Sequence, residues 1–364
     1  MAIPYARQHI SKEDIAAVIV ALEEDYLTTG PRVGEFEAAF ADYVEAPYAV
    51  AVSSGTAALH LCALALGVQA GDKVLVPSFT FAASSNCIRY CGGTPVFVDI
   101  DPATGLLDLG LVKKMLEADE YVGIVAVDYA GYSVDMEALR LLADAHGCWI
   151  IEDSCHAPGG AFENSKGEVI ACGSGRYADL AIFSFHPAKH ITTGEGGMVT
   201  TANEELYKNL LRLRTHGITR EPEMLTEKPG GWYYEIHEMG YNYRLTDFQS
   251  VLGMSQLTRA KAGIARRRAI AKAYNDAFAE SPVNIIAPPP HIHHAYHLYV
   301  IQVEDRKGLY DYLRTQEIYA QVHYVPTHLM PYTNGKRGDL PHTEQFYDHC
   351  LSLPMYDTLS DEDQ

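Results

Sequence analysis

The sequence has little basic charge, few cysteines and no long apolar run. Its 28 Lys and Arg residues face 47 Asp and Glu residues, which gives a formal net charge of −19. Nucleic acid is therefore not an expected partner, because phosphate backbones bind to basic faces. No apolar run approaches the ~20 residues that cross a bilayer. Residues 1–9 also lack a basic segment followed by an apolar one, so neither a membrane span nor a signal peptide is expected.

The seven cysteines are an odd number and are spread widely. That pattern favours a reducing cytoplasm over a framework of disulfides. Cys87 and Cys91 are spaced loosely like metal ligands, but no second pair lies nearby, and no metal site is expected. A GxGxxG motif after the first apolar strand is also missing, which argues against a nucleotide-binding dehydrogenase.

Short apolar runs alternate with helical patterns between about residues 35 and 255. Strands are expected at 74–76, 95–98, 124–127, 149–151, 181–185 and 198–200, with helices between them that include 57–66 and 135–146. Such alternation predicts an α/β fold in which helices cover both faces of a mostly parallel sheet. Ligands of such sheets bind beyond the carboxyl ends of the strands.

The alternation of expected strands and helices ends near residue 256. A long charged helix is expected over 256–278, followed by a proline-rich loop and by the histidine-rich run 291–297, which we interpret as a loop that enters a strand at 298–303. We therefore expect a large α/β domain over 1–255 and a smaller α+β domain over 256–364. At the end of the sequence, Ser360 and the acidic residues after it are typical of the start of a capped helix.

Lys189 stands in an unusual context. It follows the expected strand 181–185 by four residues and precedes a turn that contains Gly194, Gly196 and Gly197. A lysine held against such a tight frame loses solvation, so its pKa falls and its amine can attack a carbonyl group. Lys189 is therefore the first candidate catalytic residue.

Of two further segments, one has the features of an anion-binding site and the other those of a buried acidic residue. Gly55 and Thr56 open a helix after small residues, where free backbone N–H groups and the helix dipole bind phosphate, although an ordinary capped helix has the same pattern. The strand at 149–151 ends in Glu152 and Asp153. Its alternation favours Asp153 as the acid that faces a ligand, and a helix cap or a surface acid is the alternative.

Two further segments carry polar and aromatic side chains that suit a ligand. His156 lies in the turn after Asp153, where it either contacts a ligand or has a structural role. The loop 240–247 packs two tyrosines, Asn242 and Arg244 before a helix expected over 247–257. An arginine there can grip a carboxylate or a phosphate with two hydrogen bonds.

In this order and at these spacings, the segments resemble those of the DegT/DnrJ/EryC1/StrS-type sugar aminotransferases, which are pyridoxal phosphate (PLP) enzymes of fold type I, with the aspartate aminotransferase-like fold. The resemblance extends over residues 3–354 and implies PLP, together with its aminated form PMP, as the cofactor. It implies that Lys189 holds the cofactor covalently and carries protons. The other cofactor contacts that it implies are Asp153 at the pyridine nitrogen, Gly55, Thr56 and Ser184 at the phosphate, Phe81 stacked on the ring, and His156 beside it.

The resemblance also implies a homodimer in which Asn242 reaches the phosphate of the neighbouring subunit's cofactor. Tyr5, Gly30, Arg244 and His323 are the substrate contacts that it implies. Relatives with a histidine in place of the lysine are dehydratases; Lys189 is present, although His190 beside it makes the register worth checking. A regulator that binds PLP without catalysis would need a fused DNA-binding module or a lost lysine, and neither is seen.

Within the family, residues 183–197 and 232–249 most resemble the branch that serves pseudaminic acid synthesis. That branch implies transfer of an amino group from L-glutamate to the C4 ketone of a UDP-2-acetamido-2,6-dideoxy-hexos-4-ulose. The product is UDP-4-amino-4,6-dideoxy-N-acetyl-altrosamine, a precursor for flagellin glycosylation. The alternative within the family is amination at C4, or C3, of a different UDP- or dTDP-linked keto-deoxysugar.

Overall fold

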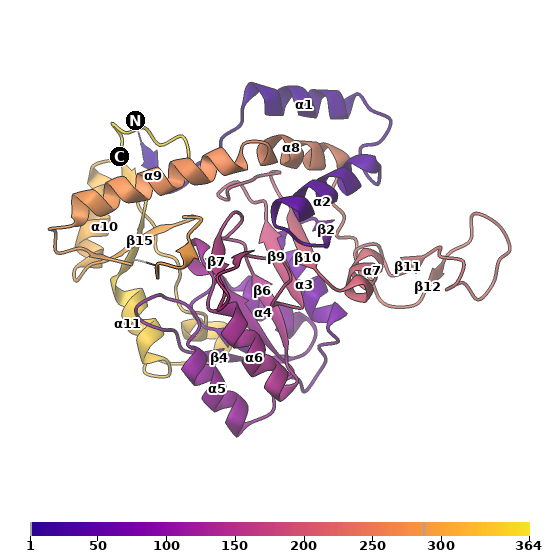
Figure 1. Ribbon diagram of the computed structural model, residues 1–364, viewed down its shortest axis with the longest axis horizontal. Helices are drawn as coiled ribbons and strands as arrows, with labels where there is room; N and C mark the ends of the chain where they lie inside the picture. Colours follow the sequence, from indigo (N-terminus) through magenta and orange to yellow (C-terminus); the bar gives the residue numbers. More distant parts are fainter. Residues whose placement is uncertain (1, 287) are drawn as a thin grey trace.

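A seven-stranded sheet forms the centre of the protein. The computed structural model describes residues 2–286 and 288–364, and its central strands run in the order β2-β10-β9-β6-β5-β3-β4 (Figure 1). They are β2 (Tyr48–Val52), β3 (Lys73–Pro77), β4 (Thr94–Val98), β5 (Gly123–Val127), β6 (Trp149–Asp153), β9 (Leu180–Ser184) and β10 (Gly197–Thr201). Only β10 runs against its neighbours β2 and β9, and the other pairs are parallel. The predicted mostly parallel sheet is confirmed.

Helices cover both faces because successive strand residues point to opposite sides. Val125 and Ile151 belong to a core with α3 (Gly55–Ala65), α4 (Ala83–Tyr90) and α7 (Glu204–Leu213). Their neighbours Ile124 and Ile150 belong to a second core with α5 (Leu109–Ala118) and α6 (Met136–His146). α2 (Pro31–Tyr43) extends this second layer over β2, β9 and β10. The result is a three-layer α/β arrangement.

The strands predicted for the central sheet agree with the structure to within a few residues, and one strand of that sheet was omitted. The strand expected at 181–185 spans 180–184, and Asp135 caps α6 through a bond from the Ala138 N–H to its carboxylate rather than lying inside the helix. The edge strand β2 was not predicted. It forms because Tyr48–Val52 pair along their whole length with β10.

Two helices cross one end of the sheet in succession. α8 (Asp247–Leu257) has the bounds expected from the sequence, and α9 (Ala260–Phe278) follows it. The expected start of the second helix at 256 was wrong, since Gln256 still belongs to α8. The chain turns between them, where the Thr258 hydroxyl donates to the Ser255 carbonyl and Arg259 turns its side chain to Asp14 of α1 (Lys12–Leu22).

Smaller sheets lie at the C-terminal side. β13 (Asn284–Ile285), β15 (Tyr299–Gln302) and β17 (Cys350–Leu353) form a three-stranded sheet with α10 (Arg306–Thr315) and α11 (Pro341–His349) nearby. β14 (Ile292–His293) pairs with β7 (Ala161–Glu163), which pairs with β8 (Val169–Ala171), and β1 (Ile3–Pro4) pairs with β16 (Ile318–Tyr319). Short 3₁₀ turns occupy Tyr129–Gly131, Thr327–Leu329 and Pro331–Thr333. The histidine-rich run therefore leads, as predicted, through a loop into a strand, and it also contains β14.

The chain after Tyr356 ends in a turn. The Asp363 N–H donates to the Ser360 hydroxyl oxygen at 3.0 Å, which is the bond expected of a capping serine. A single turn follows Ser360 within the sequence.

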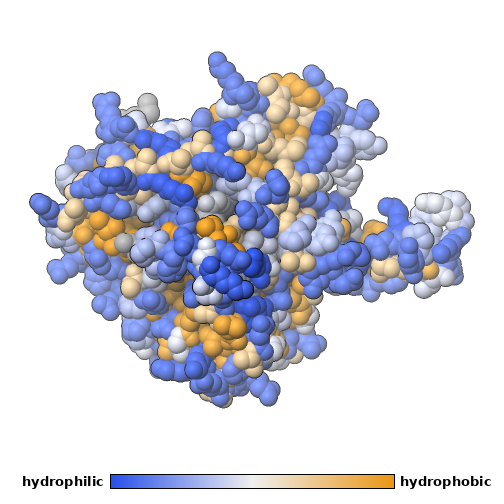
Figure 2. All heavy atoms as spheres, viewed as in Figure 1, coloured by the Kyte–Doolittle hydropathy of each residue, from blue (hydrophilic) through white to orange (hydrophobic). Residues whose placement is uncertain are grey.

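A narrow arm projects from the body beyond α7 (Figures 1 and 2). It carries the two-stranded pair β11 (Ile218–Thr219) and β12 (Glu235–Ile236), and it exposes Trp232, Tyr234, Ile236 and Met239. Within residues 2–286 and 288–364, none of the helices combines the length and apolar character needed to cross a bilayer.

Candidate active site

A cavity of about 420 Å³ lies beyond the carboxyl ends of β2, β3, β6 and β9. This is the edge where ligands of parallel sheets bind. Residues predicted from four separate segments line it together: Gly55, Thr56, Phe81, Asp153, His156, Ser184 and Lys189. Tyr5 and His323, predicted as substrate contacts, line it too. The fold thus gathers nine of the predicted residues around one space.

Lys189 lies in the loop that returns from β9 to β10. Its backbone N–H donates to the His186 carbonyl at 2.8 Å, and Gly194 further along takes a positive φ of 81° that few other residues adopt. The side chain is half-buried and reaches the cavity. Burial lowers the pKa of Lys189, and the neighbouring Asp153 offsets part of that effect. A larger share of the amine is therefore unprotonated than on a solvated lysine.

Asp153 is the last residue of β6 and is 6% exposed. The Ser84 hydroxyl donates to its Oδ2 at 2.8 Å, and the Cys155 N–H donates to its Oδ1 at 3.2 Å. These bonds fix the carboxylate at the wall of the cavity, as the alternation of β6 predicts. Ser84, which was not predicted, holds this acid from α4.

Gly55 marks a close approach between α3 and β9. A Cβ atom on Gly55 would lie 3.0 Å from the Ser184 Cβ and 3.4 Å from the Cys155 Sγ. Thr56 beside it is exposed towards the cavity, and Ser54 caps the helix by accepting the Ala57 N–H. The first turn of α3 thus faces Ser184 across a narrow gap, where N–H groups and hydroxyls are available to an anion.

His156 lies deep in the cavity wall and is 5% exposed. Its Nε2 is 3.0 Å from the Tyr324 hydroxyl, and its ring centroid is 4.2 Å from that of His297. Burial, followed by the positive charge of Lys189, lowers the pKa of His156 well below its ordinary value. His156 is therefore a neutral ring at physiological pH.

His297 also lines the cavity, although the sequence analysis did not single it out. Its Nε2 lies 3.5 Å from the Lys189 Nζ. The sequence carried one signal, the crowded histidines of 291–297, but the run alone does not distinguish His297 from the others.

Two of the predicted substrate residues and the predicted cofactor residue Asn242 lie elsewhere. Gly30 and Arg244 line a separate cleft of about 230 Å³ with Arg214 and Glu37. Asn242 is exposed, forms an isolated bridge with Thr215 and does not line the Lys189 cavity of its own chain. Within one chain, the structure therefore does not bring these three residues to the lysine.

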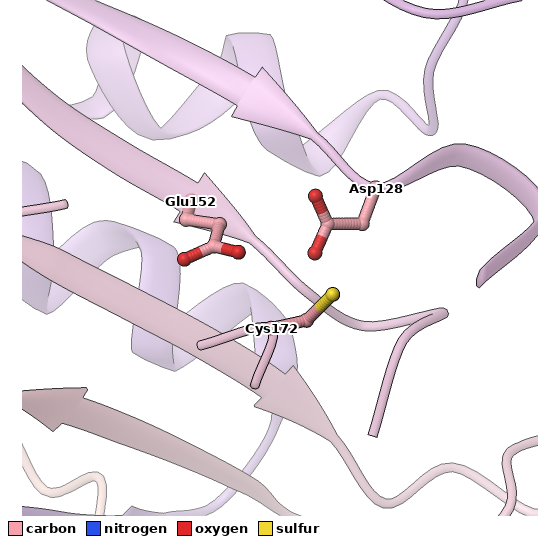
Figure 3. Close-up of side chains that lie close together, drawn as sticks. All are labelled: Asp128, Glu152 and Cys172. Atoms are coloured by element: carbon pink, nitrogen blue, oxygen red, sulfur yellow. The ribbon is translucent and has the colours of Figure 1, made fainter. Parts of the chain in front are cut away.

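A second acidic group lies on the opposite side of β6 from Asp153. Asp128, Glu152 and Cys172 are all buried, and one oxygen or sulfur atom of each lies within 4.8 Å of the others (Figure 3). Burial raises the pKa of Asp128 well above its usual range and that of Glu152 to about 7. Two carboxylates cannot both stay charged so close together in the interior, so the pair retains a proton at neutral pH.

The cavity suits PLP on three observations. Lys189, whose amine has a lowered pKa, lines the same space as Asp153, whose carboxylate is fixed by a hydrogen bond. The gap beside Gly55 is one that a single added methyl group would fill. Phe81 is 60% exposed at the rim, where an aromatic ring can cover a flat ligand.

Comparisons with known proteins agree with this geometry. The sequence model of the DegT/DnrJ/EryC1/StrS aminotransferase family matches residues 8–364. The spore coat polysaccharide biosynthesis protein SpsC of Bacillus subtilis is 38% identical over 379 residues, which cover 99% of this chain and 94% of SpsC.

Two solved structures are similar over their whole length. The PLP form of the putative sugar aminotransferase Spr1654 from Streptococcus pneumoniae has a TM-score of 0.90 at 31% identity, covering 100% of this chain and 96% of that one. Helicobacter pylori PseC, an aminotransferase involved in the biosynthesis of pseudoaminic acid, has a TM-score of 0.90 at 30% identity, with the same coverage.

Proposed function

Since the chain belongs to the DegT/DnrJ/EryC1/StrS aminotransferase family, whose enzymes use PLP to aminate sugars, we propose that it acts on a nucleotide-linked 4-keto sugar. The proposed substrate is a UDP-2-acetamido-2,6-dideoxy-hexos-4-ulose, and the proposed amino donor is L-glutamate. The observation that carries the proposal is the presence of Lys189 and Asp153 on the wall of one cavity.

When bound, PLP supplies a carbonyl carbon that takes up the amino group and a ring that accepts the electrons of a breaking C–H bond. In the proposal, Lys189 holds the cofactor through Nζ, and the Asp153 carboxylate holds a proton on the pyridine nitrogen. Gly55, Thr56 and Ser184 bind the phosphate. Phe81 and His156 hold the ring plane and keep water from it.

Lys189 is proposed to carry protons in both half-reactions. Its Nζ removes the proton from the Cα of glutamate in the first half and delivers a proton to C4 of the sugar in the second. The lowered pKa of Lys189 supports this role, because an unprotonated amine is needed to accept the first proton.

The active unit is proposed to be a homodimer. Asn242 is exposed and lies away from its own Lys189 cavity, which fits a residue that binds the phosphate in the partner's site. Arg244 and Gly30, in their separate cleft, are proposed to bind the nucleotide sugar beside the neighbouring cofactor. Tyr5 and His323 are proposed to bind the sugar within the same chain's cavity.

The identity of the sugar rests on residues 183–197 and 232–249 and on the similarity to PseC at 30% identity. Spr1654 is similar at 31% identity, so another UDP- or dTDP-linked keto-deoxysugar is the alternative substrate.

A panel of substrates tests the assignment. The purified enzyme is given L-glutamate with UDP- and dTDP-linked 4-keto sugars, and the amino sugars are identified by NMR. We expect the highest kcat/KM with the UDP-linked 2-acetamido sugar. We expect no activity from the Lys189→Arg variant, which retains the positive charge but not the reactive amine. Activity with dTDP sugars alone would contradict the substrate while leaving the aminotransferase intact.

A further inference from the structure

Three histidines surround the inner end of the Lys189 side chain. His156 follows β6, His297 lies just before β15, and His323 follows β16. All three line the cavity and are at most 8% exposed. His297 alone has a ring nitrogen within hydrogen-bond distance of Lys189, with its Nε2 3.5 Å from Nζ. Among the described residues no other side chain forms a hydrogen bond with this amine.

The acidic side chains near Lys189 do not serve as the hydrogen-bond acceptor for its amine. Asp153 directs both of its oxygens to other donors, the Ser84 hydroxyl and the Cys155 N–H. Burial, followed by the charge of Asp153, raises the pKa of the Cys155 thiol well above its usual value, so the thiol stays uncharged. A protonated Lys189 therefore depends on His297 for a direct acceptor.

His297 is suited to that role because it is neutral. Burial lowers its pKa well below the ordinary value, and the positive charges of Lys189 and Arg267 lower it further. A neutral imidazole carries a hydrogen on one nitrogen and a lone pair on the other. The His297 Nδ1 is buried and has no hydrogen-bond partner among residues 2–286 and 288–364, whereas Nε2 faces the lysine.

We propose that His297 is a positioning residue for Lys189: its Nε2 accepts a hydrogen bond from the protonated Nζ and thereby directs the remaining N–H bonds of the amine towards the reacting carbon. The inference rests on the proposed aminotransferase function but not on the identity of the sugar. No proton passes to the ring. The proton that Nζ takes from Cα stays on Nζ, held by His297, until it is delivered to the next carbon.

Two variants distinguish the effect of losing the hydrogen-bond acceptor from the effect of changing the shape of the ring. His297→Phe retains a flat ring but no acceptor, and His297→Gln provides an amide oxygen in place of Nε2. In apoprotein, trinitrobenzenesulfonate arylates the unprotonated Lys189 amine, which displaces sulfite from the reagent. The pH dependence of this reaction, read by peptide mass spectrometry, reports the lysine pKa without cofactor or substrate. We expect His297→Phe to lower that pKa by at least one unit, a tenfold change in the ionisation constant, because the buried ammonium loses its partner. His297→Gln should restore most of it.

The loaded enzyme gives an independent reading. With any accepted sugar, His297→Phe should lower kcat about tenfold or more with little change in KM, because the effect falls on proton transfer rather than on binding. A Lys189 titration that is identical in wild type and in folded His297→Phe would overturn the proposal.

A third measurement does not depend on a histidine variant folding. In apoprotein labelled with ¹⁵N-histidine, the His297 resonances should show a neutral ring with its hydrogen on Nδ1. The Nε2 resonance should shift in Lys189→Met, which removes the donor. A ring with its hydrogen on Nε2, or resonances unaffected by Lys189→Met, would also overturn the proposal.

Discussion

The side chains around Lys189 are nearly all uncharged. The neighbouring rings of His156 and His297 are neutral because burial lowers their pKa values, and burial also lowers the pKa of His323, to about 3. Asp153 and Glu195 both line the cavity, and Asp153 is the buried one of the two. A buried carboxylate beside neutral groups acts strongly on a cation that it faces, because solvent screens it less than the exposed Glu195.

We therefore predict a large effect from neutralising this charge. Asp153→Asn would remove the proposed charge-assisted hydrogen bond to the cofactor ring, and a bond of that kind is worth about 1.5–3 kcal/mol. That energy corresponds to a loss of roughly 10- to 150-fold in kcat/KM. Steady-state kinetics with glutamate and the accepted sugar measure it.

Ser84→Ala is the matched control, because it removes the 2.8 Å bond to the Asp153 Oδ2 but leaves the charge. Its loss should be less than about tenfold, because the bond from the Cys155 N–H still holds the carboxylate in place. Equal losses in the two variants would show that the orientation of Asp153, and not its charge, matters.

The pattern of residues along single strands and loops predicted some of the site residues and not others. Asp153 was preferred over Glu152 from its place on the strand, and the structure confirms that the two carboxyl groups lie on opposite sides of β6. His297 and Ser84 were not predicted as site residues. Their positions depend on how β15 and α4 pack against β6 and β9, which strand periodicity does not encode.

At the scale of helices and strands, α8 has the bounds expected from the sequence, and the structure adds that Thr246 and Gln249 form a capping box at its start. β2 was missed because five small and apolar residues do not distinguish a strand until a partner is known. The division of the chain at residues 255 and 256 stays a prediction.

Asp14 joins α1 to the end of α8. Its carboxylate accepts hydrogen bonds from Ser255, Gln256 and Arg259, and from the Ser11 N–H as part of a capping box. Burial raises the pKa of Asp14, but the bonds from Arg259, Ser255 and Ser11 outweigh it and lower the pKa from 3.8 to about 2. The folded state thus favours the charged form.

Because the folded pKa lies below the unfolded one, the stabilisation is present above pH 4 and is lost as the pH falls towards 2. We predict that Asp14→Asn lowers the free energy of unfolding by about 2 kcal/mol at pH 7. The difference from wild type should shrink below pH 4. Urea unfolding at a series of pH values measures it.

Asp25→Asn serves as its control, since Asp25 is exposed and has no hydrogen bond or ion pair among the described residues. It should change the stability by less than about 0.5 kcal/mol. A loss at pH 7 that is the same for both substitutions would contradict a specific role for Asp14.

At the scale of the whole molecule, the arm with β11 and β12 carries large apolar side chains into solvent (Figure 2). Asn242 lies between β12 and α8 and forms an isolated bridge with Thr215. A second copy of the chain that covers this region fits the proposed shared site.

Subunit complementation tests the shared site. Lys189→Ala and Asn242→Ala should each be nearly inactive, but a heterodimer of the two contains one site with both residues intact. After mixing and subunit exchange in equal amounts, we expect roughly a quarter of the wild-type sites to return.

The matched control mixes Lys189→Ala with the double variant Lys189→Ala, Asn242→Ala, which yields no intact site. If exchange is shown by mass spectrometry of the dimers and activity does not return, Asn242 does not serve the partner's site.

The buried pair Asp128–Glu152 also affects how the stability of this protein is measured. Both groups titrate above their usual range in the folded state, Glu152 near pH 7. Near pH 8, where the histidines are neutral in the folded and the unfolded chain alike, unfolding therefore releases protons to the solvent. The heat recorded in a calorimeter then includes the ionisation heat of the buffer that takes up those protons. Unfolding enthalpies measured in phosphate and in an amine buffer will differ at the same pH, and the slope against buffer ionisation enthalpy counts the net protons released.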